Sequence, residues 1–303
     1  MSEVIQSDKG ARSLVQSSGQ GPKIALALGS GSARGWAHIG VIKALENEGI
    51  RPAIVCGSSI GALVGAAYLN GHLADLEDWA KRIGRWKVFR ILDLRFSKGT
   101  VIDSDKLRNE ISEIIGDKYL QIEDLPRPYA AVATDLLTGQ EVRFTHGPLH
   151  EAIWCSSAIP GILPPVYYRD RWLIDGGVVN PVPVNICHQL DADIVIAINL
   201  NGDIVRSGSR GGGENNEEGN GAPTKLSPPN MFDTFADAIN IMQDRITRSR
   251  MVGDPPDVLI VPRLARIGML EFERAAEAID DGYAAVERQL PEIRHLLKTV
   301  HRD

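Results

Sequence analysis

The stretch that most constrains the fold of this chain is residues 53–68, an apolar run with a glycine-containing turn in its middle. The first half is short and rich in β-branched residues, which favours a buried strand, whereas the second half has Ala, Leu and Val at helical spacing. Between the halves lies Gly57-x-Ser59-x-Gly61, the spacing of a nucleophile elbow. The alternative interpretation is a tight strand-to-helix turn with an incidental serine.

The two glycines of this motif answer a steric requirement. A serine on a sharp strand-to-helix turn has little room beside it, so the positions two before and two after it must lack a side chain. Gly57 and Gly61 occupy those positions around Ser59. The spacing therefore predicts that Ser59 is presented as a nucleophile.

The neighbouring stretches predict a parallel sheet. Residues 23–28 form a short apolar strand, a small-residue loop follows at 29–35, and helical spacing follows that loop up to residue 45. With the elbow unit, the opening of the chain is strand, helix, strand, helix, which is typical of a parallel sheet, and residues 193–199 are a continuous apolar strand of the kind found in two-sided sheets. We expect an α/β fold with three α/β/α layers and a mostly parallel central sheet.

The domain organisation follows from composition along the chain. Residues 1–22 are polar and predict a disordered tail without a signal peptide, and residues 23–303 predict one domain. Residues 202–230 are rich in Gly, Ser, Asn, Glu and Pro, which predicts a flexible insertion. After it, apolar residues three and four apart over 232–246 predict a helix whose apolar face belongs to the core.

Charge and cysteine content limit the partners and the compartment. The formal net charge of −6 disfavours a nucleic-acid partner. Cys56, Cys155 and Cys187 each lie among apolar neighbours, which predicts reduced, buried thiols and a cytoplasmic location. The sequence has no Cys-x-x-Cys motif, and we expect neither a metal nor another cofactor.

The loop at residues 29–35, Gly-Ser-Gly-Ser-Ala-Arg-Gly, has the composition of an anion site, because small residues let backbone N–H groups converge. A phosphate site fits poorly: there is no Gly-Lys-Ser/Thr, and Arg34 stands where a dinucleotide-binding loop has its third glycine. An oxyanion hole for Ser59 fits better, because an acyl-transfer nucleophile needs donors from a neighbouring loop. Arg34 either fixes this loop or meets an anionic head group, with a solvated surface arginine as the alternative; His38 is expected to be a structural hydrogen-bonding residue.

A serine nucleophile also needs a base. Downstream of Asp175 the histidines are His188, His295 and His301, and none is expected on a loop after a strand, where a triad histidine belongs. Asp175 itself ends a predicted strand and precedes two glycines, so its carboxylate would be presented at the edge of the sheet. We favour a Ser59–Asp175 dyad. The alternative for Asp-Gly-Gly is a turn in which the aspartate bonds to its own backbone.

Taken in order, four motifs resemble the patatin-like phospholipase family, and its short bacterial members in particular. They are Gly-x-Gly-x-Ala-Arg-Gly-x-Ala-His-Ile-Gly-Val, Gly-x-Ser-Ile-Gly, Ser-Ser-Ala-Ile-Pro and Asp-Gly-Gly, within about residues 23–200. The resemblance implies a histidine-free Ser–Asp dyad on Ser59 and Asp175, a glycine-rich oxyanion loop and hydrolysis of lipid acyl esters. Carried over to this chain, the oxyanion and substrate-binding residues are Gly29, Gly31, Ser32, Ala33 and Arg34, and the motif glycines are Gly57, Gly61 and Gly176.

The chain departs from the family pattern in one place. Members often have three or four consecutive glycines in the oxyanion loop, whereas Ser30 and Ser32 alternate with glycine here. Backbone donors survive that change where the local φ angle suits serine.

The expected function is a serine acyl hydrolase of phospholipase, lysophospholipase or carboxylesterase type, with an acyl-enzyme on Ser59 and Asp175 as general base. Two alternatives stay open: a Ser-Asp-His hydrolase of small esters, and a low-activity regulatory or interaction protein on a hydrolase shell. The expected partners are a lipid or lysolipid ester and, peripherally, the inner membrane surface. Residues 86–98 interleave aromatic and cationic side chains and could guide lipid, although a buried connector is the favoured interpretation.

Overall fold

The computed structural model describes residues 21–83, 104–204 and 231–300 of the 303-residue chain. The predicted tail at 1–22 and the predicted insertion at 202–230 lie almost wholly outside the described residues, and the aromatic and cationic stretch at 86–98 lies wholly outside them.

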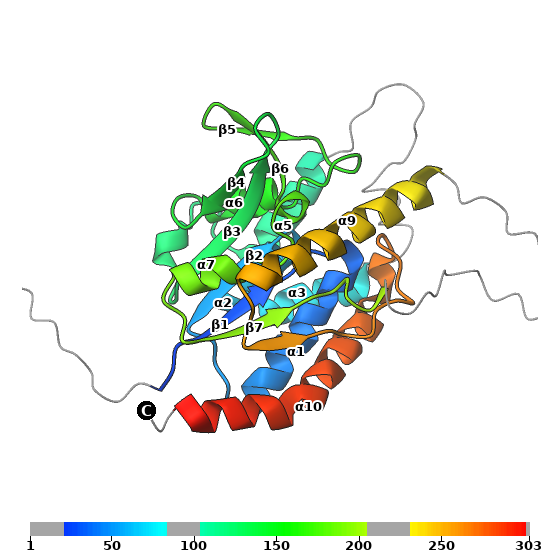
Figure 1. Cartoon of the computed structure of the whole chain (residues 1–303). Helices are drawn as coiled ribbons and strands as arrows, with labels where there is room; N and C mark the ends of the chain where they lie inside the picture. The colour runs from blue at the N-terminus through cyan, green and yellow to red at the C-terminus, as the bar shows by residue number, and fades with distance from the viewer. Residues whose placement is uncertain (1–20, 84–103, 205–230, 301–303) are drawn as a thin grey trace, which may run out of the picture.

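A mixed, mostly parallel sheet of eight strands forms the centre of the protein (Figure 1). The strands are β1 (Ile24–Leu28), β2 (Ile54–Ser58), β3 (Tyr129–Asp135), β4 (Glu141–Phe144), β5 (Val166–Tyr168), β6 (Arg171–Asp175), β7 (Ile194–Ile198) and β8 (Val258–Ile260). Their order is β5-β6-β3-β2-β1-β7-β8, with β4 also paired to β3. The pairs that involve β1, β2, β7 and β8 are parallel, whereas β3–β4, β3–β6 and β5–β6 are antiparallel.

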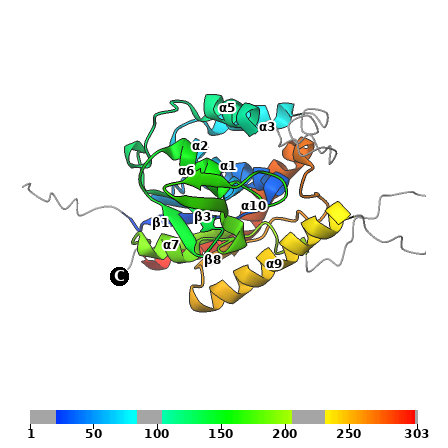
Figure 2. The ribbon, with the colours of Figure 1, turned by 90° about the horizontal axis from the view of Figure 1, so that it is seen from above.

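Helices cover both faces of this sheet, as Figure 2 shows from above. The α-helices are α1 (Ala37–Asn47), α2 (Ile60–Leu69), α3 (Leu73–Arg82), α5 (Ser104–Ile115), α6 (Leu149–Ser156), α7 (Val184–Gln189), α9 (Met231–Gly253) and α10 (Ala275–Val300). Short 3-10 turns are η1 (Ser32–Trp36), η2 (Ile122–Asp124), η3 (Gly176–Val178) and η4 (Phe272–Arg274). Within the described part of the chain, no helix combines the length and the apolar character that a membrane crossing requires.

The core consists of two apolar clusters, one on each face of the sheet. Along β1, Leu26 and Leu28 face the larger cluster with α1, α2, α6 and α10, while Ala25 and Ala27 face the smaller cluster with α7. Successive residues of a strand point to opposite faces, so a strand covered on both sides must be apolar throughout. The three-layer α/β/α arrangement predicted from these apolar runs is confirmed. Cys56, Cys155 and Cys187 are buried free thiols, also as predicted.

The prediction that the apolar face of residues 232–246 belongs to the core is correct only in part, because Ile239 packs against the larger apolar cluster while other residues of that face are exposed. Helix α9 forms, but Phe235 and Met242 are 39% and 55% exposed. Among the side chains of α9 that the structure describes, those that are fully buried are polar, and Ile239 and Ile246 are half-buried. The fully buried residues are Asn240, Gln243, Asp244 and Thr247. The physical reason lies in what α9 covers. It packs against η3 and against loops at the ends of the strands, where Asn240 and Gln243 find hydrogen-bond partners in Arg34 and Asn201, so part of its buried face is polar.

Candidate active site

Ser59 occupies a strained turn between β2 and α2. Its φ of 58° and ψ of −125° are rare for a non-glycine residue and cost about 1–3 kcal/mol. Close backbone packing explains the flanking glycines: a Cβ on Gly57 would lie 2.4 Å from the backbone N of Ala62, and a Cβ on Gly61 would lie 2.2 Å from the carbonyl O of Leu28. The strain and the packing match the geometry that the Gly-x-Ser-x-Gly spacing predicts.

The side chain of Ser59 points to Asp175. Ser59 is the N-cap residue of α2, yet its hydroxyl does not cap the helix; instead Oγ donates a hydrogen bond to Oδ2 of Asp175. The other carboxylate oxygen of Asp175 accepts the backbone N–H of Gly177 at 2.7 Å. Both interpretations of Asp-Gly-Gly therefore apply, because one carboxylate closes the local turn and also contacts the serine.

Strand pairing on β3 brings these two residues together. Strand β2 ends with Ser58 opposite Val132, and β6 ends with Asp175 opposite the next residue, Ala133. Strand β4 pairs with residues 131–134 of β3 and so occupies one edge of β3 at this point. Strands β2 and β6 therefore both pair with the opposite edge of β3, where their ends meet. The residue after Ser58 is thus placed beside the last residue of β6. The backbone carbonyl of Asp175 is held by the hydroxyl of Thr134 at 2.8 Å.

Burial makes Asp175 an unusually basic carboxylate. Ser59 and Asp175 are each only 3% exposed. Removal from water raises the pKa of Asp175 from 3.8 to about 7, even though the hydrogen bonds from Ser59 and Gly177 favour the ionised form. A carboxyl group with a pKa near neutral can accept a proton and return it at the same pH.

Among the described residues, no histidine has a hydrogen bond to Ser59 or Asp175. Nε2 of His188 lies 3.4 Å from the carbonyl O of Pro255, and His295 lies on α10. His38 is nearer, but its Nε2 bonds to the carbonyl O of Gly29 at 2.8 Å, and burial lowers its pKa to about 4. His38 is therefore neutral at pH 7 and has the structural role predicted for it. His301 lies outside the described residues.

The loop at residues 29–35 has two unused backbone donors. The N–H groups of Gly29, Ala33 and Arg34 are committed to the carbonyl groups of Ile198 (3.1 Å), Met269 (3.1 Å) and Gly31 (3.2 Å). In the described part of the chain, by contrast, the N–H groups of Gly31 and Ser32 donate to no acceptor. The predicted oxyanion loop thus has free donors at two of its five named positions.

Arg34 is buried and connects the loop at residues 29–35 to α9 through a hydrogen bond to Asn240. Only 1% of it is exposed, and it donates from Nη2 to Oδ1 of Asn240 at 2.6 Å and from Nε to the carbonyl O of Gly31 at 3.4 Å. Burial lowers the pKa of Arg34 to about 10, with Asp237 acting in the opposite direction, so the side chain remains a cation at pH 7. Of the interpretations offered for Arg34, fixing the loop agrees with these contacts and a solvated surface position is wrong.

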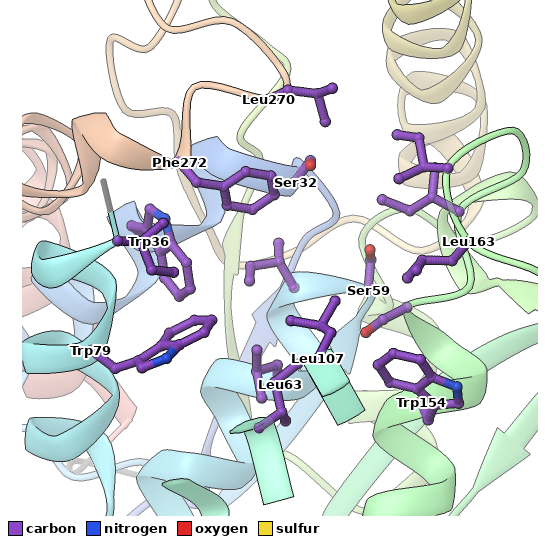
Figure 3. Close-up of a pocket in the computed structure, with 16 residues that line it drawn as sticks. Ser32, Trp36, Ser59, Leu63, Trp79, Leu107, Trp154, Leu163, Leu270 and Phe272 are labelled. Atoms are coloured by element: carbon purple, nitrogen blue, oxygen red, sulfur yellow. The ribbon is translucent and has the colours of Figure 1, made fainter. Parts of the chain in front are cut away.

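Ser59 lines an apolar pocket of about 780 Å³, a volume that includes the solvent at its opening (Figure 3). Aromatic rings form one wall, with the ring of Trp36 6.0 Å from that of Trp79 and 6.1 Å from that of Phe272. The lining residues are Ser32, Trp36, Ser59, Ile60, Leu63, Trp79, Ile83, Leu107, Ile111, Trp154, Ser157, Ile159, Ile162, Leu163, Leu270 and Phe272.

Sequence reasoning did not assign roles to two polar residues that support the site. Oγ of Ser156, which is wholly buried, accepts the backbone N–H of Ser59 at 2.9 Å and so holds the elbow. Asn240 anchors Arg34 from α9. Ser156 belongs to the Ser-Ser-Ala-Ile-Pro motif, which was a usable signal, whereas nothing local marks Asn240. The tryptophans that line the pocket are far apart in the sequence, and no sequence pattern predicted that they would lie together.

A buried serine lies on a strand-to-helix elbow inside a three-layer α/β fold and lines an apolar pocket. These features place the protein in the class of α/β proteins built around a nucleophile elbow. Within that class the family is shown by sequence: residues 26–188 match the family described as patatin-like phospholipase. The chain belongs to this family.

Relatives with similar sequences are found in bacteria and animals. The chain is 44% identical over 181 residues to "Uncharacterized NTE family protein Rv1063c" of Mycobacterium tuberculosis, a match that covers 60% of this chain and 50% of that protein. It is 34% identical over 187 residues to "Neuropathy target esterase sws" of Drosophila melanogaster, covering 59% of this chain and 13% of that protein. The chain thus matches half the length of the mycobacterial protein and a small part of the fly protein.

The fold also resembles a solved structure. VipD from Legionella pneumophila superimposes with a TM-score of 0.56 at 13% sequence identity, covering 90% of this chain and 67% of that chain. At that identity the likeness concerns the fold alone.

Proposed function

We propose that this protein is a serine acyl hydrolase that cleaves lipid acyl esters through an acyl-enzyme on Ser59, with Asp175 as general base. The observation on which the proposal depends is the direct contact of the Ser59 hydroxyl, which lines an apolar pocket, with a buried carboxylate. Membership of the patatin-like phospholipase family supports a hydrolase acting on ester bonds.

In the acylation step, Oγ of Ser59 attacks the ester carbonyl carbon while its proton passes to Oδ2 of Asp175. The carbonyl π electrons move to oxygen, and the N–H groups of Gly31 and Ser32 donate to the resulting oxyanion. Collapse of this intermediate expels the alcohol, which takes the proton from Asp175. Each oxyanion donor of this kind typically contributes a factor of about 10²–10³ to kcat.

In the deacylation step, Asp175 removes a proton from a water molecule, whose oxygen attacks the acyl-enzyme carbonyl. The same donors stabilise the second oxyanion, and the proton returns to Oγ of Ser59 as the fatty acid leaves. The acyl chain lies meanwhile in the apolar pocket, where its burial yields about 0.8 kcal/mol for each CH₂ removed from water.

The first experiment separates this mechanism from its two alternatives. Purified protein is exposed to a fluorophosphonate probe and to a short-chain nitrophenyl ester, together with Ser59→Ala, Asp175→Asn, His295→Ala and His301→Ala variants. We expect loss of labelling and turnover in Ser59→Ala, loss of turnover in Asp175→Asn, and turnover in both histidine variants. Abolished turnover in a histidine variant would support a Ser-Asp-His hydrolase, and an unlabelled wild type would support a regulatory protein on a hydrolase shell.

The second experiment defines the substrate class. Release of fatty acid is measured from phospholipids, lysophospholipids and neutral esters of matched chain length, with Ser59→Ala as the blank. A lipid acyl hydrolase hydrolyses at least one lipid class faster than the short-chain ester, because the longer chain fills the pocket.

We further propose that the protein works in the cytoplasm and meets the inner membrane surface peripherally. The three free thiols suit a reducing compartment. A substrate that resides in a bilayer can reach Ser59 only when the pocket mouth contacts the lipid surface. Co-sedimentation of Ser59→Ala with vesicles of anionic and zwitterionic phospholipid tests this contact.

A further inference from the structure

The hydroxyl of Ser32 is a buried polar group that has no role in the acylation and deacylation steps described above. Ser32 is 4% exposed, and among the described residues no group accepts or donates a hydrogen bond at its Oγ. A buried hydroxyl without a partner has lost its hydrogen bonds to water without forming new ones, and this reduces the free energy of unfolding. Such exceptions are few in folded proteins and require an explanation.

The position of Ser32 offers an explanation for its unpartnered hydroxyl. Ser32 and Ser59 both line the apolar pocket, and Figure 3 shows them on neighbouring walls of it. Ser32 comes from η1 and Ser59 from the adjoining elbow, two elements that pack directly against each other. The pocket lining is otherwise almost wholly apolar, with Ser157 as its third hydroxyl residue. A polar group of substrate beside Ser59 therefore lies in the same pocket as the Ser32 hydroxyl.

The backbone conformation of Ser32 favours glycine over serine, so the presence of a side chain here requires a reason. Its φ of 51° lies in the left-handed region, where glycine has no steric penalty and serine does. Glycine would also provide the same backbone N–H. The hydroxyl is therefore the one thing that serine adds at this position, and it faces the pocket.

We propose that the Ser32 hydroxyl is a catalytic donor of the oxyanion hole, acting beside the N–H groups of Gly31 and Ser32. This inference rests on the proposed acyl-transfer function. When Oγ of Ser59 adds to the ester carbonyl, negative charge develops on the carbonyl oxygen, and the Ser32 O–H donates to it; no proton is transferred in that contact. A donor aimed at the charge of the transition state raises kcat and leaves substrate binding nearly unchanged.

The test compares Ser32→Gly and Ser32→Ala with the wild type. Both variants keep the backbone N–H and lack the hydroxyl, and glycine also relieves the positive φ. We expect kcat for a nitrophenyl ester to fall by about 10²-fold in each variant with little change in KM. Affinity for a boronic acid that mimics the tetrahedral intermediate should weaken in parallel. Ser32→Gly should have an unfolding midpoint at or above that of the wild type, which separates a lost donor from a damaged fold.

Ser249→Ala is the control. It removes an exposed hydroxyl on α9 that is not part of the pocket lining, so kcat should stay at the wild-type value. If Ser32→Gly retains the kcat and boronic-acid affinity of the wild type, the hydroxyl has no catalytic role and the inference is overturned. A wild type that neither hydrolyses esters nor reacts with fluorophosphonate would overturn the acyl-hydrolase proposal and this inference with it.

Discussion

Oγ of Ser59 donates a hydrogen bond to Oδ2 of Asp175, although 116 positions separate the two residues in the sequence. The contact needs no intermediary because the residue before Ser59 and Asp175 itself lie opposite consecutive residues of β3. Its chemical effect depends on the low exposure of both side chains, since burial is what makes this carboxylate basic.

The pH dependence of turnover should follow the ionisation of Asp175. Only its carboxylate form can accept the Ser59 proton, and burial raises its pKa to about 7. We expect kcat/KM to rise about tenfold per pH unit up to near pH 7 and to level off above it. Stopped-time assays with a nitrophenyl ester between about pH 5 and 9 measure this profile. An inflection near 4 would mean that Asp175 titrates as an ordinary carboxyl group.

Replacing the same carboxylate should stabilise the fold at alkaline pH. The pKa of Asp175 is 3.8 in an ordinary setting and about 7 in the folded protein, so between these values the folded state holds the proton that the unfolded state releases. Stability therefore falls as pH rises through this window. We expect Asp175→Asn to unfold at least about 2 °C above the wild type at pH 8, with the difference vanishing near pH 4. A lower midpoint for Asp175→Asn than for the wild type at pH 8 would contradict the prediction.

A methyl group at the elbow should be costly. The Cβ of Gly61→Ala would lie 2.2 Å from the carbonyl O of Leu28, which belongs to a central strand that cannot move aside. We expect a loss of about 3 kcal/mol or more in the free energy of unfolding, measured with urea. Gly253→Ala is the control, because no atom lies within 4 Å of its added methyl group, and it should change stability by less than about 0.5 kcal/mol. Equal stability of the two variants would argue against the close packing of the elbow.

Ser156→Ala should impair the elbow without touching substrate. The substitution leaves the buried N–H of Ser59 without its acceptor, at a cost of about 1–3 kcal/mol in unfolding free energy. Because the strained backbone of Ser59 loses a restraint, we expect kcat to fall by about 10- to 100-fold while KM changes little. The rate of fluorophosphonate labelling at Ser59 reports the same loss independently. Wild-type labelling in a destabilised Ser156→Ala protein would limit Ser156 to a structural role.

The contact between Arg34 and Asn240 should couple the oxyanion loop to α9. A double-mutant cycle with Arg34→Gln and Asn240→Ala isolates this contact, and we expect a coupling free energy of about 1–3 kcal/mol in urea unfolding. Hydrogen exchange should also quicken along α9 in each single variant. Arg245→Gln, on the exposed side of the same helix, is the control. Additive single effects would mean that α9 is held by its other contacts.

Much of the architecture could be predicted because it follows from local patterns. Apolar runs with β-branched residues became strands, and the Gly-x-Ser-x-Gly spacing became a strained turn. The same approach held only in part for α9, where Ile239 packs against the core but Phe235 and Met242 are exposed. Periodicity reports that a helix has two faces. It does not report whether its partner surface is apolar or polar.

The sequence predicted the motifs of the site and the pairing of Ser59 with Asp175, but not how the fold brings them together. Ser59 and Asp175 were predicted to act as a dyad from spacing and resemblance, but neither pattern contains the strand pairing on β3 that brings the two side chains into contact. The helper residues Ser156 and Asn240 had no assigned role, because hydrogen bonds to backbone N–H groups and buried cations depend on long-range packing.

The sequence alone determined where the chain must turn sharply and which strands must be covered on both faces, since steric exclusion at Gly57 and Gly61 and the apolar character of β1 act over a few residues. The meeting of β2 and β6 on β3, the near-neutral pKa of Asp175 and the lining of the pocket were decided only in the folded protein. These properties arise from pairing between distant segments and from the exclusion of water, and neither exists until the chain has packed.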